Sequence, residues 1–340
     1  MDNWILKGVK NLANQPASVN ITSPTQIKVK VSHLLLTEYD VMLYNGLMET
    51  AYPRILGRIA VGIVTEAGEK CYGIEKGTRV YLEPARACGE CLPCKSGKAK
   101  ECRGVLAAGK DFDGFMRDFV VCEYNEVAPL PAAVDDFHAL CIETIGIAQN
   151  IYEKLQLSAG QKVAVIGGGF SGNIIAQVLL YHKIVPIVID NSPANLEKAK
   201  KCGIYYAFSA DDDLRENVKT ATAGSLCDAA VYCSGSRLPV SLAPRLVADG
   251  KSLVLSVQST NAPALDVSSV IERNLQVFGV NNAYGYTEAV INMLMRNAVN
   301  LDFIEKEVLT DFNLSELLDE KSPLTGSARQ GKMTVLKMII

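Results

Sequence analysis

The glycine-rich segment Gly167–Gly172 constrains the fold of this chain more than any other feature of the sequence. It has the spacing G-x-G-x-x-G. An apolar run typical of a β-strand, Lys162–Ile166, comes directly before it, and a helical pattern over Ser171–His182 comes after it. A strand, a glycine turn and a helix in this order are the signature of a βαβ unit that binds a dinucleotide. The alternative, a glycine turn without a ligand, leaves this complete context unexplained.

Each position of the turn has a physical role in such a unit. Gly167 permits the tight turn, Gly169 lets the backbone approach a pyrophosphate, and Gly172 allows the helix to pack closely on the strand. Phe170 and Ser171 open the helix, whose free N–H groups attract an anion. We therefore expect these five residues to bind the cofactor.

An acidic residue, Asp190, ends the second expected strand, 23 residues after Gly167. A carboxylate at this place accepts hydrogen bonds from both hydroxyls of a ribose, and it repels a 2′-phosphate. No arginine lies beside Asp190, whose neighbours are Ile189 and Asn191. These observations favour NAD over NADP as the cofactor.

Strands and helices alternate after about residue 162, which predicts an α/β fold with a doubly wound parallel sheet, a Rossmann domain. Besides the strand and helix already named, the expected strands are Ile184–Ile189, Ile204–Phe208, Ala229–Cys233, Ser252–Val257 and Gln276–Val280, and the expected helices are Pro193–Cys202 and Pro239–Val247.

The first 135 or so residues read differently, because short extended runs are broken there by Gly and Pro, which predicts a β-rich domain. Its expected strands are Gln26–His33, Ala60–Glu66, Arg79–Glu83 and Phe115–Cys122, and a long helix from about Phe137 to Leu155 leads to the next domain. A helix at Thr287–Ala298 and a strand at Lys332–Ile339 follow the Rossmann pattern.

At 340 residues the chain exceeds what one hydrophobic core supports, so two domains are expected. We divide it into residues 1–140, a β-rich domain, residues 141–280, the nucleotide-binding domain, and residues 281–340, a segment that returns to the first domain.

The charge balance argues against a nucleic-acid or membrane partner. The 34 basic and 37 acidic residues give a net charge of −3, and no basic block is present. The sequence has no signal peptide and no run of 18 apolar residues, so we expect a cytoplasmic protein. Its ten cysteines are then expected to be thiols or metal ligands, because the cytosol keeps thiols reduced.

Four of these cysteines, Cys88, Cys91, Cys94 and Cys102, fall within fifteen residues. Their spacing allows four thiolates to surround one tetrahedral ion, for which zinc is best suited. An iron–sulfur cluster has a different fourth spacing, and reduced thiols without metal are the remaining alternative. Four protein ligands leave no open coordination position, so we expect one structural zinc per chain, in a lobe over residues 84–104.

Together these motifs resemble the zinc-containing medium-chain dehydrogenases, the alcohol and polyol dehydrogenase family. The resemblance extends over almost the whole chain. It rests on the nucleotide fingerprint, the cysteine lobe after Glu83-Pro84, Leu56-Gly57 with Val61-Gly62, Asp113-Gly114-Phe115, and Pro129-Leu130-Pro131. It implies a GroES-like first domain, a Rossmann domain, and a cleft between them in which hydride passes to or from the nicotinamide.

The chain departs from this family at the catalytic zinc. By alignment, the family's cysteine ligand corresponds to Thr37, its histidine ligand to Arg58, and the adjacent glutamate to Ile59. Only Glu143, 24 residues before Gly167, keeps a ligand position, and one carboxylate does not hold zinc. The three histidines, His33, His138 and His182, fall outside the ligand positions and are expected to be packing residues.

Three functions remain open. The first is an NAD-dependent oxidoreductase of small carbonyl or alcohol substrates that works without catalytic zinc. In it Arg58 polarises the substrate oxygen or holds an anionic group, and Tyr39 donates a proton if the cation lowers its pKa. The second is an inactive NAD-binding regulator or scaffold in which Arg58 and Glu143 form an inert pair. The third, a double-bond reductase, fits the cysteine lobe and Asp190 poorly. We expect a small-molecule substrate and a homodimer or homotetramer.

Overall fold

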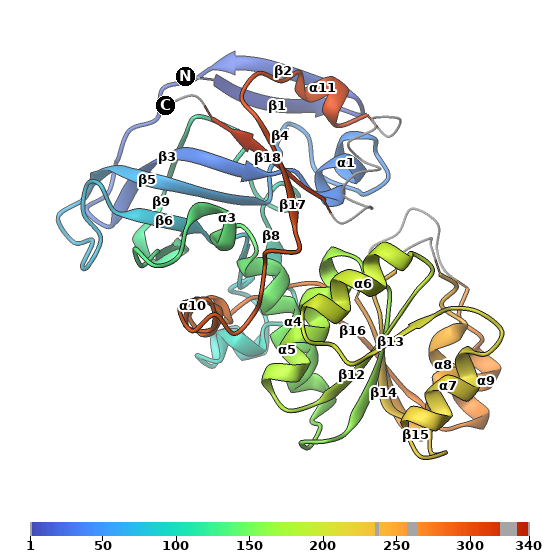
Figure 1. Ribbon diagram of the computed structural model, residues 1–340. Helices are drawn as coiled ribbons and strands as arrows, with labels where there is room; N and C mark the ends of the chain where they lie inside the picture. Colours follow the sequence, from blue (N-terminus) through green and yellow to red (C-terminus); the bar gives the residue numbers. More distant parts are fainter. Residues whose placement is uncertain (1, 235–237, 257–263, 320–331, 339–340) are drawn as a thin grey trace. The chain divides into compact units, whose positions relative to one another are not determined.

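The computed structural model describes residues 2–234, 238–256, 264–319 and 332–338. The chain divides into two compact units (Figure 1). Unit 1 comprises residues 1–143, 287–295 and 305–340, and unit 2 comprises residues 144–286 and 296–304. Unit 1 is therefore built from three separate stretches of sequence.

Unit 1 contains a seven-stranded sheet in the order β10-β6-β5-β3-β18-β17, with β9 also paired to β3. Neighbouring strands are antiparallel except for β17 and β18, which run parallel. The strands are β3 (Gln26–Leu35), β5 (Ile59–Ala67), β6 (Arg79–Leu82), β9 (Phe119–Glu123), β10 (Val127–Pro129), β17 (Glu305–Leu309) and β18 (Lys332–Lys337).

The long central strand β3 anchors the core of unit 1. Its residues Ile27, Val29 and Val31 alternate along the strand, so their side chains point to one face, and all three are fully buried. Unit 1 also contains several shorter elements. They are strands β1 (Asp2–Gly8), β2 (Asn11–Pro16), β4 (Arg54–Ile55), β7 (Ala85–Arg86) and β8 (Leu106–Ala107), helices α1 (Glu38–Tyr44), α2 (Leu92–Lys95), α3 (Asp136–Ala139), α10 (Thr287–Met295) and α11 (Leu314–Leu317), and the 3-10 turns η1 (Ala99–Glu101) and η2 (Tyr124–Glu126).

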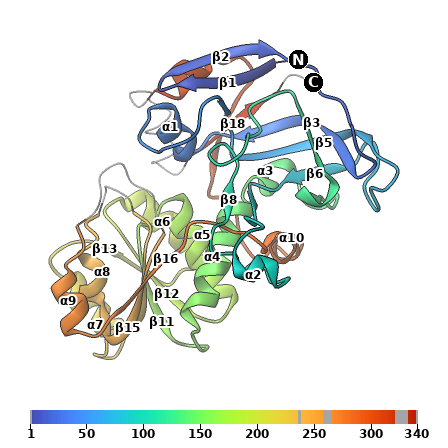
Figure 2. The same ribbon diagram turned by 180° about the vertical axis from the view of Figure 1, so that it is seen from behind.

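Both ends of the described chain belong to unit 1, as the view from behind also shows (Figure 2). Strand β1 pairs with β2 and β4 in a small separate sheet, whereas β18 pairs with β3 and β17 inside the large one. The last strand is therefore an interior strand of the sheet.

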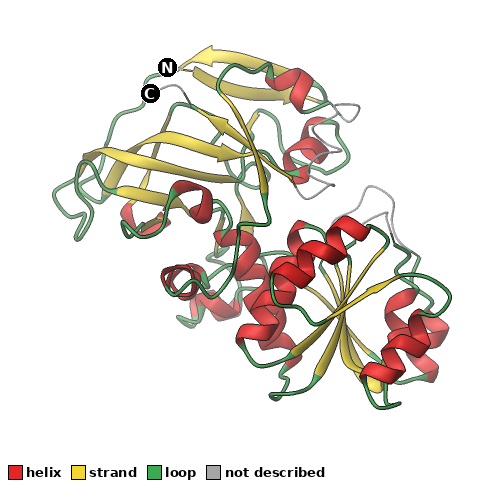
Figure 3. Ribbon diagram, viewed as in Figure 1, coloured by secondary structure: helices red, strands yellow, loops and turns green. Residues whose placement is uncertain are grey.

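Unit 2 is a six-stranded parallel sheet in the order β13-β12-β11-β14-β15-β16. Helices cover both of its faces (Figures 1 and 3). The strands are β11 (Lys162–Ile166), β12 (Val185–Asp190), β13 (Tyr206–Ser209), β14 (Cys227–Tyr232), β15 (Val247–Leu255) and β16 (Gln276–Gly279), and the helices are α4 (Ile142–Leu155, whose first two residues belong to unit 1), α5 (Phe170–Tyr181), α6 (Pro193–Lys201), α7 (Leu214–Ala221), α8 (Leu242–Leu246) and α9 (Val267–Glu272).

The central strands explain this architecture. Val163, Ala164, Val165 and Ile166 are all fully buried, so β11 is covered on both faces, as expected for a parallel strand between two helical layers. Strand order changes direction at β11, with β12 on one side and β14 on the other. Ligands of such sheets bind at the carboxyl ends of the strands at this point. The predicted α/β class and parallel sheet are confirmed.

Two predicted elements differ from the structure for local reasons. The long helix expected from Phe137 to Leu155 is two helices, because the N–H of Cys141 bonds to the carbonyl of His138, three residues back, and interrupts the α-helical pattern. The strand expected from Phe115 begins at Phe119, because the N–H groups of Phe115 and Met116 bond instead to Gly57 and Leu56.

The sequence patterns also missed several elements. The hairpin β1–β2 was not predicted, since the polar strand β2 lacks β-branched residues, and β17, α1, α7 and α9 were not predicted either. The expected ends at Val257 and Ile339 lie outside the described residues. Within the described part of the chain, no helix combines the length and apolar character needed to span a bilayer.

Candidate functional site

A buried ion pair occupies the region where the sequence places the displaced zinc ligands. Arg58 directly precedes β5, and Glu143 lies in the first turn of α4. The Arg58 Nη2 atom donates to Glu143 Oε1 at 2.6 Å, and the two side chains are only 8% and 5% exposed. Burial lowers the pKa of Arg58, but the charge of Glu143 and its hydrogen bond more than offset this effect, so the pKa lies above its ordinary value. Arg58 is therefore a permanent cation.

Thr37 has a structural role beside this pair. It is the N-cap of α1, and its hydroxyl donates to Asp40 Oδ2 at 2.6 Å in a capping box. The second carboxylate oxygen of Asp40 accepts the N–H of Gly57 at 2.9 Å. Asp40 thus links the cap of α1 to the backbone immediately before Arg58. The Thr37 hydroxyl already donates its hydrogen bond to Asp40.

Tyr39 lies against the cation. The guanidinium carbon of Arg58 is 4.8 Å from the centre of the Tyr39 ring, a cation–π distance. Arg58 lowers the pKa of Tyr39, as expected, but the net pKa lies above its ordinary value. Burial raises this pKa to about 12, and the charge of Arg58 opposes the effect without reversing it. Tyr39 is therefore a protonated phenol at neutral pH, a state in which it donates but does not accept a proton.

Two residues of β6 and its end belong to the same region but were not predicted. Tyr81 is fully buried, and its hydroxyl has no hydrogen-bond partner among the described residues. Glu83 accepts a hydrogen bond from the Thr287 hydroxyl at 3.0 Å. Burial raises the pKa of Glu83 to about 7, helped by Glu143 and Glu288 and opposed by the Thr287 bond. The alternation of Tyr81 and Glu83 on one strand is the sequence signal that points to them.

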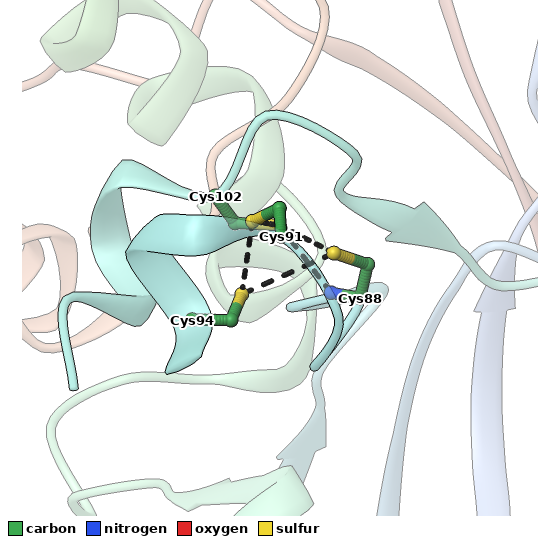
Figure 4. A group of neighbouring side chains, drawn as sticks. All are labelled: Cys88, Cys91, Cys94 and Cys102. Carbon is green, nitrogen blue, oxygen red and sulfur yellow. Dashed lines mark hydrogen bonds between the residues drawn. The ribbon is translucent and has the colours of Figure 1, made fainter. Parts of the chain in front are cut away.

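The four predicted zinc ligands lie together in unit 1 (Figure 4). Their Sγ atoms are 3.4 Å apart for Cys91 and Cys94, 3.5 Å for Cys88 and Cys102, 3.9 Å for Cys91 and Cys102, and 4.0 Å for Cys88 and Cys94. Zinc with Zn–S bonds of about 2.3 Å requires sulfurs about 3.8 Å apart in a tetrahedron. The four thiols fit a structural zinc.

No second group of this kind is found in the described part of the chain, where only these four cysteines bring three or more His, Cys, Asp or Glu ligand atoms together. The histidines have other partners. His33 bonds to Asp136, His138 to Asp135, and His182 to Gln149 while it stacks on Tyr152. Glu143 belongs to no such group among the described residues, and its carboxylate accepts the hydrogen bond from Arg58.

The glycine turn between β11 and α5 has the shape that a dinucleotide needs. Gly167 has φ +108°, and a Cβ there would meet Ser234 at 2.8 Å. At Gly172 a Cβ would lie 1.6 Å from the Gly167 carbonyl oxygen. In contrast, a Cβ on Gly169 would meet nothing within 4 Å. The fold therefore requires glycine at positions 167 and 172. At Gly169 the absence of a side chain leaves the backbone N–H groups at the helix N-terminus accessible to an anion.

Asp190 ends β12 next to this turn. Its carboxylate accepts the N–H of Gly168 at 2.7 Å and that of Ser192 at 2.7 Å, and it is only 5% exposed. The side-chain amide of Asn195 donates to the same carboxylate at 3.2 Å. These bonds fix Asp190 beside the glycine turn, at the place where a ribose follows the pyrophosphate in such units.

Comparison with known families identifies two matching models. Residues 23–132 match the alcohol dehydrogenase GroES-like domain, and residues 171–296 match the zinc-binding dehydrogenase domain. A sorbitol dehydrogenase of Halalkalibacterium halodurans is 32% identical over 215 residues, which are 62% of this chain and 63% of the relative. A zinc-type alcohol dehydrogenase-like protein of Haemophilus influenzae is 24% identical over 83% of each chain.

Solved structures agree at the level of the fold. An Escherichia coli CFT073 alcohol dehydrogenase, solved in complex with NADH, superposes with a TM-score of 0.82 over 99% of both chains at 24% identity. The alcohol dehydrogenase of Thermus sp. ATN1 gives a TM-score of 0.81 over the full length of both chains at 20% identity.

Proposed function

This chain belongs to the zinc-type medium-chain dehydrogenase/reductase family of oxidoreductases, and we propose that it interconverts a small alcohol or polyol and its carbonyl form, with NAD(H) as cofactor and without a catalytic zinc. The observation that carries this proposal is the buried Arg58–Glu143 pair, formed by two residues that the sequence aligns with ligands of the family's catalytic metal.

The cofactor-binding residues are those of unit 2. Gly167, Gly169 and the amino end of α5 would hold the pyrophosphate, and Asp190 the adenosine ribose. The bound dinucleotide would supply the acceptor or donor of hydride at its nicotinamide. The carboxylate of Asp190 favours NAD(H) over NADP(H), since a 2′-phosphate would meet its negative charge.

The residues of unit 1 would act on the substrate. Arg58 takes over the electrostatic task of a Lewis acid, because its fixed positive charge stabilises the negative charge that develops on the substrate oxygen. Glu143 holds the guanidinium plane in place. Tyr39, protonated at neutral pH and in contact with Arg58, would donate a proton in the reducing direction.

The names of relatives support the substrate class. They include sorbitol dehydrogenases, 2-dehydro-3-deoxy-L-galactonate 5-dehydrogenase and D-xylulose reductases, all of which are named for sugar or polyol substrates. We also propose that the cysteine lobe binds a structural zinc and that the protein assembles as a homodimer or homotetramer.

The test is an assay of NADH oxidation and NAD reduction against polyols, ketoses, sugar acids and enals, run on protein whose zinc content has been measured. We expect turnover with at least one polyol or ketose at one zinc per chain. NADH binding without turnover of any substrate would favour the alternative, an inert Arg58–Glu143 pair in a cofactor-binding regulator. Turnover of enals alone would favour a double-bond reductase.

A further inference from the structure

The cysteine lobe, residues 84–104, is a surface segment without a core of its own. A short antiparallel pairing of β7 with β8 closes its base. Beyond this pairing, no residue from 88 to 104 is buried, and the side chain of Leu92 is 77% exposed. Segments that cannot build a core are held by metals or disulfides. The conformation of the lobe therefore depends on what joins its four sulfurs.

The four cysteines are open to small reagents, since all of them are partly exposed. A cysteine that binds zinc is a thiolate, which is also the form that reacts with oxidants. Redox-active cysteines combine thiolate character and exposure with a second cysteine close enough to form a disulfide. Each cysteine of the lobe has such a neighbour.

The sulfurs fall into two close pairs (Figure 4). The Sγ atoms of Cys91 and Cys94 are 3.4 Å apart, and those of Cys88 and Cys102 are 3.5 Å apart. Two contacts between these pairs are longer, at 3.9 and 4.0 Å. Because the S–S bond is about 2.05 Å long, each close pair has to approach by about 1.4 Å to form a disulfide. No buried side chain of the lobe opposes this movement.

The backbone favours the same pairing. Cys91 and Cys94 have the Cys-x-x-Cys spacing of disulfide oxidoreductases. The N–H of Cys88 donates to the Sγ atom of Cys102 at 3.3 Å, so these two residues are also in contact. The small ring closed by Cys91 and Cys94 lies inside the larger ring closed by Cys88 and Cys102, so both bonds can form together. Four cysteines allow three pairings, and this one agrees with the sulfur distances and with the backbone.

We propose that the cysteine lobe is a site of reversible oxidation, at which hydrogen peroxide converts the four zinc-binding thiolates into the disulfides Cys91–Cys94 and Cys88–Cys102. Zinc leaves, because a disulfide sulfur is no longer a thiolate ligand. The disulfides then hold the lobe in place of the metal. The site depends on the structural zinc proposed above and is independent of the substrate chemistry.

Each disulfide forms in two steps. The thiolate of one cysteine attacks the peroxide, so that an S–O bond forms, the O–O bond breaks and hydroxide leaves. The thiolate of the paired cysteine then attacks the same sulfur, so that the S–S bond forms, the S–O bond breaks and a second hydroxide leaves. The two sulfurs lose one electron pair to the peroxide, and two solvent protons convert the hydroxides to water. Two peroxide molecules are thus consumed for each zinc released.

The test treats the zinc-loaded protein with hydrogen peroxide and follows free zinc with the indicator pyridylazoresorcinol. One zinc per chain should be released while the mass of the chain falls by that of four hydrogen atoms. Trypsin divides the lobe into a peptide of residues 87–95, which holds three of the cysteines, and a peptide of residues 101–103, which holds the fourth. Fragmentation in the mass spectrometer should show Cys102 joined to Cys88, and Cys91 joined to Cys94.

Two controls separate this site from general oxidation or unfolding. Cys202 is also partly exposed but lies at the end of α6, outside the lobe, so Cys202→Ser should release the same zinc and lose the same mass. Protein stripped of zinc by a chelator should melt at a lower temperature than peroxide-treated protein, because only the latter has crosslinks in the lobe. A phosphine reductant with added zinc should restore the thiolates and the bound metal.

The outcomes distinguish this site from the proposed function. Zinc that stays bound under peroxide, sulfinic or sulfonic acids in place of disulfides, or a bond between Cys91 and Cys102 overturns the site and leaves the proposed reaction intact. Untreated protein without zinc overturns the structural zinc and this site together. None of the readouts needs a substrate, so the result does not depend on whether turnover is found.

Discussion

Arg58 is the residue on which the two candidate functions differ. A buried charge that loses its partner costs far more free energy than the intact pair contributes. Both functions therefore predict that this pair matters for stability, and only the oxidoreductase predicts that it matters for rate. A substitution that separates the two effects is needed.

We expect Arg58→Met to lower the free energy of unfolding by about 3 to 5 kcal/mol, because Glu143 is left buried without a counter-charge. The double variant Arg58→Met with Glu143→Gln should recover most of this loss, since no isolated charge remains. Urea unfolding followed by the fluorescence of Trp4, the single tryptophan and a residue of unit 1, measures both.

Kinetics of the same variants then decide the function. If Arg58 replaces the Lewis acid, the double variant should be nearly as stable as the wild type but nearly inactive. A stable double variant with wild-type turnover would contradict the catalytic role of Arg58.

The raised pKa of Glu83 predicts that the free energy of unfolding depends on pH. Its folded pKa of about 7 lies above the ordinary value of 4.5. Between these two values the folded state keeps a proton that the unfolded state releases, so stability falls as pH rises through this window. Glu83→Gln has no such proton to lose.

The variant should therefore be more stable than the wild type at pH 8, by an amount on the order of 3 kcal/mol at most, and similar to it at pH 4.5. Trp4 fluorescence during urea unfolding at both pH values measures the difference. A difference that does not change with pH would show that Glu83 has an ordinary pKa.

The sequence-based prediction and the structure agree most closely around the turn between β11 and α5. Lys162–Ile166 was predicted to the residue, and the helix after the turn within one residue of each end. Here local rules suffice, because the glycines, the apolar strand and the buried helix all favour the same structure. The alternation of Tyr81 and Glu83 along one strand is visible in the sequence, but the raised pKa of Glu83 is not, since it depends on residues of α4 and α10, which are distant in sequence.

Two glycines of this turn should respond differently to substitution. A side chain on Gly169 meets nothing within 4 Å, so Gly169→Val should fold normally and lose NADH binding, because it fills the space of the pyrophosphate. Gly172→Ala places a Cβ 1.6 Å from the Gly167 carbonyl oxygen, so it should disturb the turn itself and lower the melting temperature. Calorimetric titration with NADH and a thermal melt check both variants.

At the scale of the whole molecule, the sequence predicted the fold class and the order of the sheet domains but not how the proposed substrate site is assembled. Arg58 and Glu143 were identified as candidates, and the structure pairs them. The raised pKa of Tyr39 depends on burial, which the sequence pattern does not report. The cap at Thr37 is local, but it was missed because helix α1 was not predicted.

The metal content is a property of the whole chain. We expect one zinc per chain, because only the four thiols form a complete ligand set in the part of the chain that the structure describes. Cys94→Ser should remove this zinc and lower the stability of unit 1. Elemental analysis after dialysis checks the stoichiometry, and two zincs in the wild type would show that Thr37 and Arg58 were aligned wrongly.

The position of β18 has a consequence for the order in which the protein forms on the ribosome. Strand β18 lies between β3 and β17 in the sheet of unit 1, whereas all of unit 2 is encoded before residue 305. A nascent chain can thus complete the nucleotide-binding sheet while the sheet that carries Arg58, Tyr81 and Glu83 still lacks an interior strand. Translation that stops shortly before residue 332 would release a chain able to form unit 2 but not the proposed chemical site.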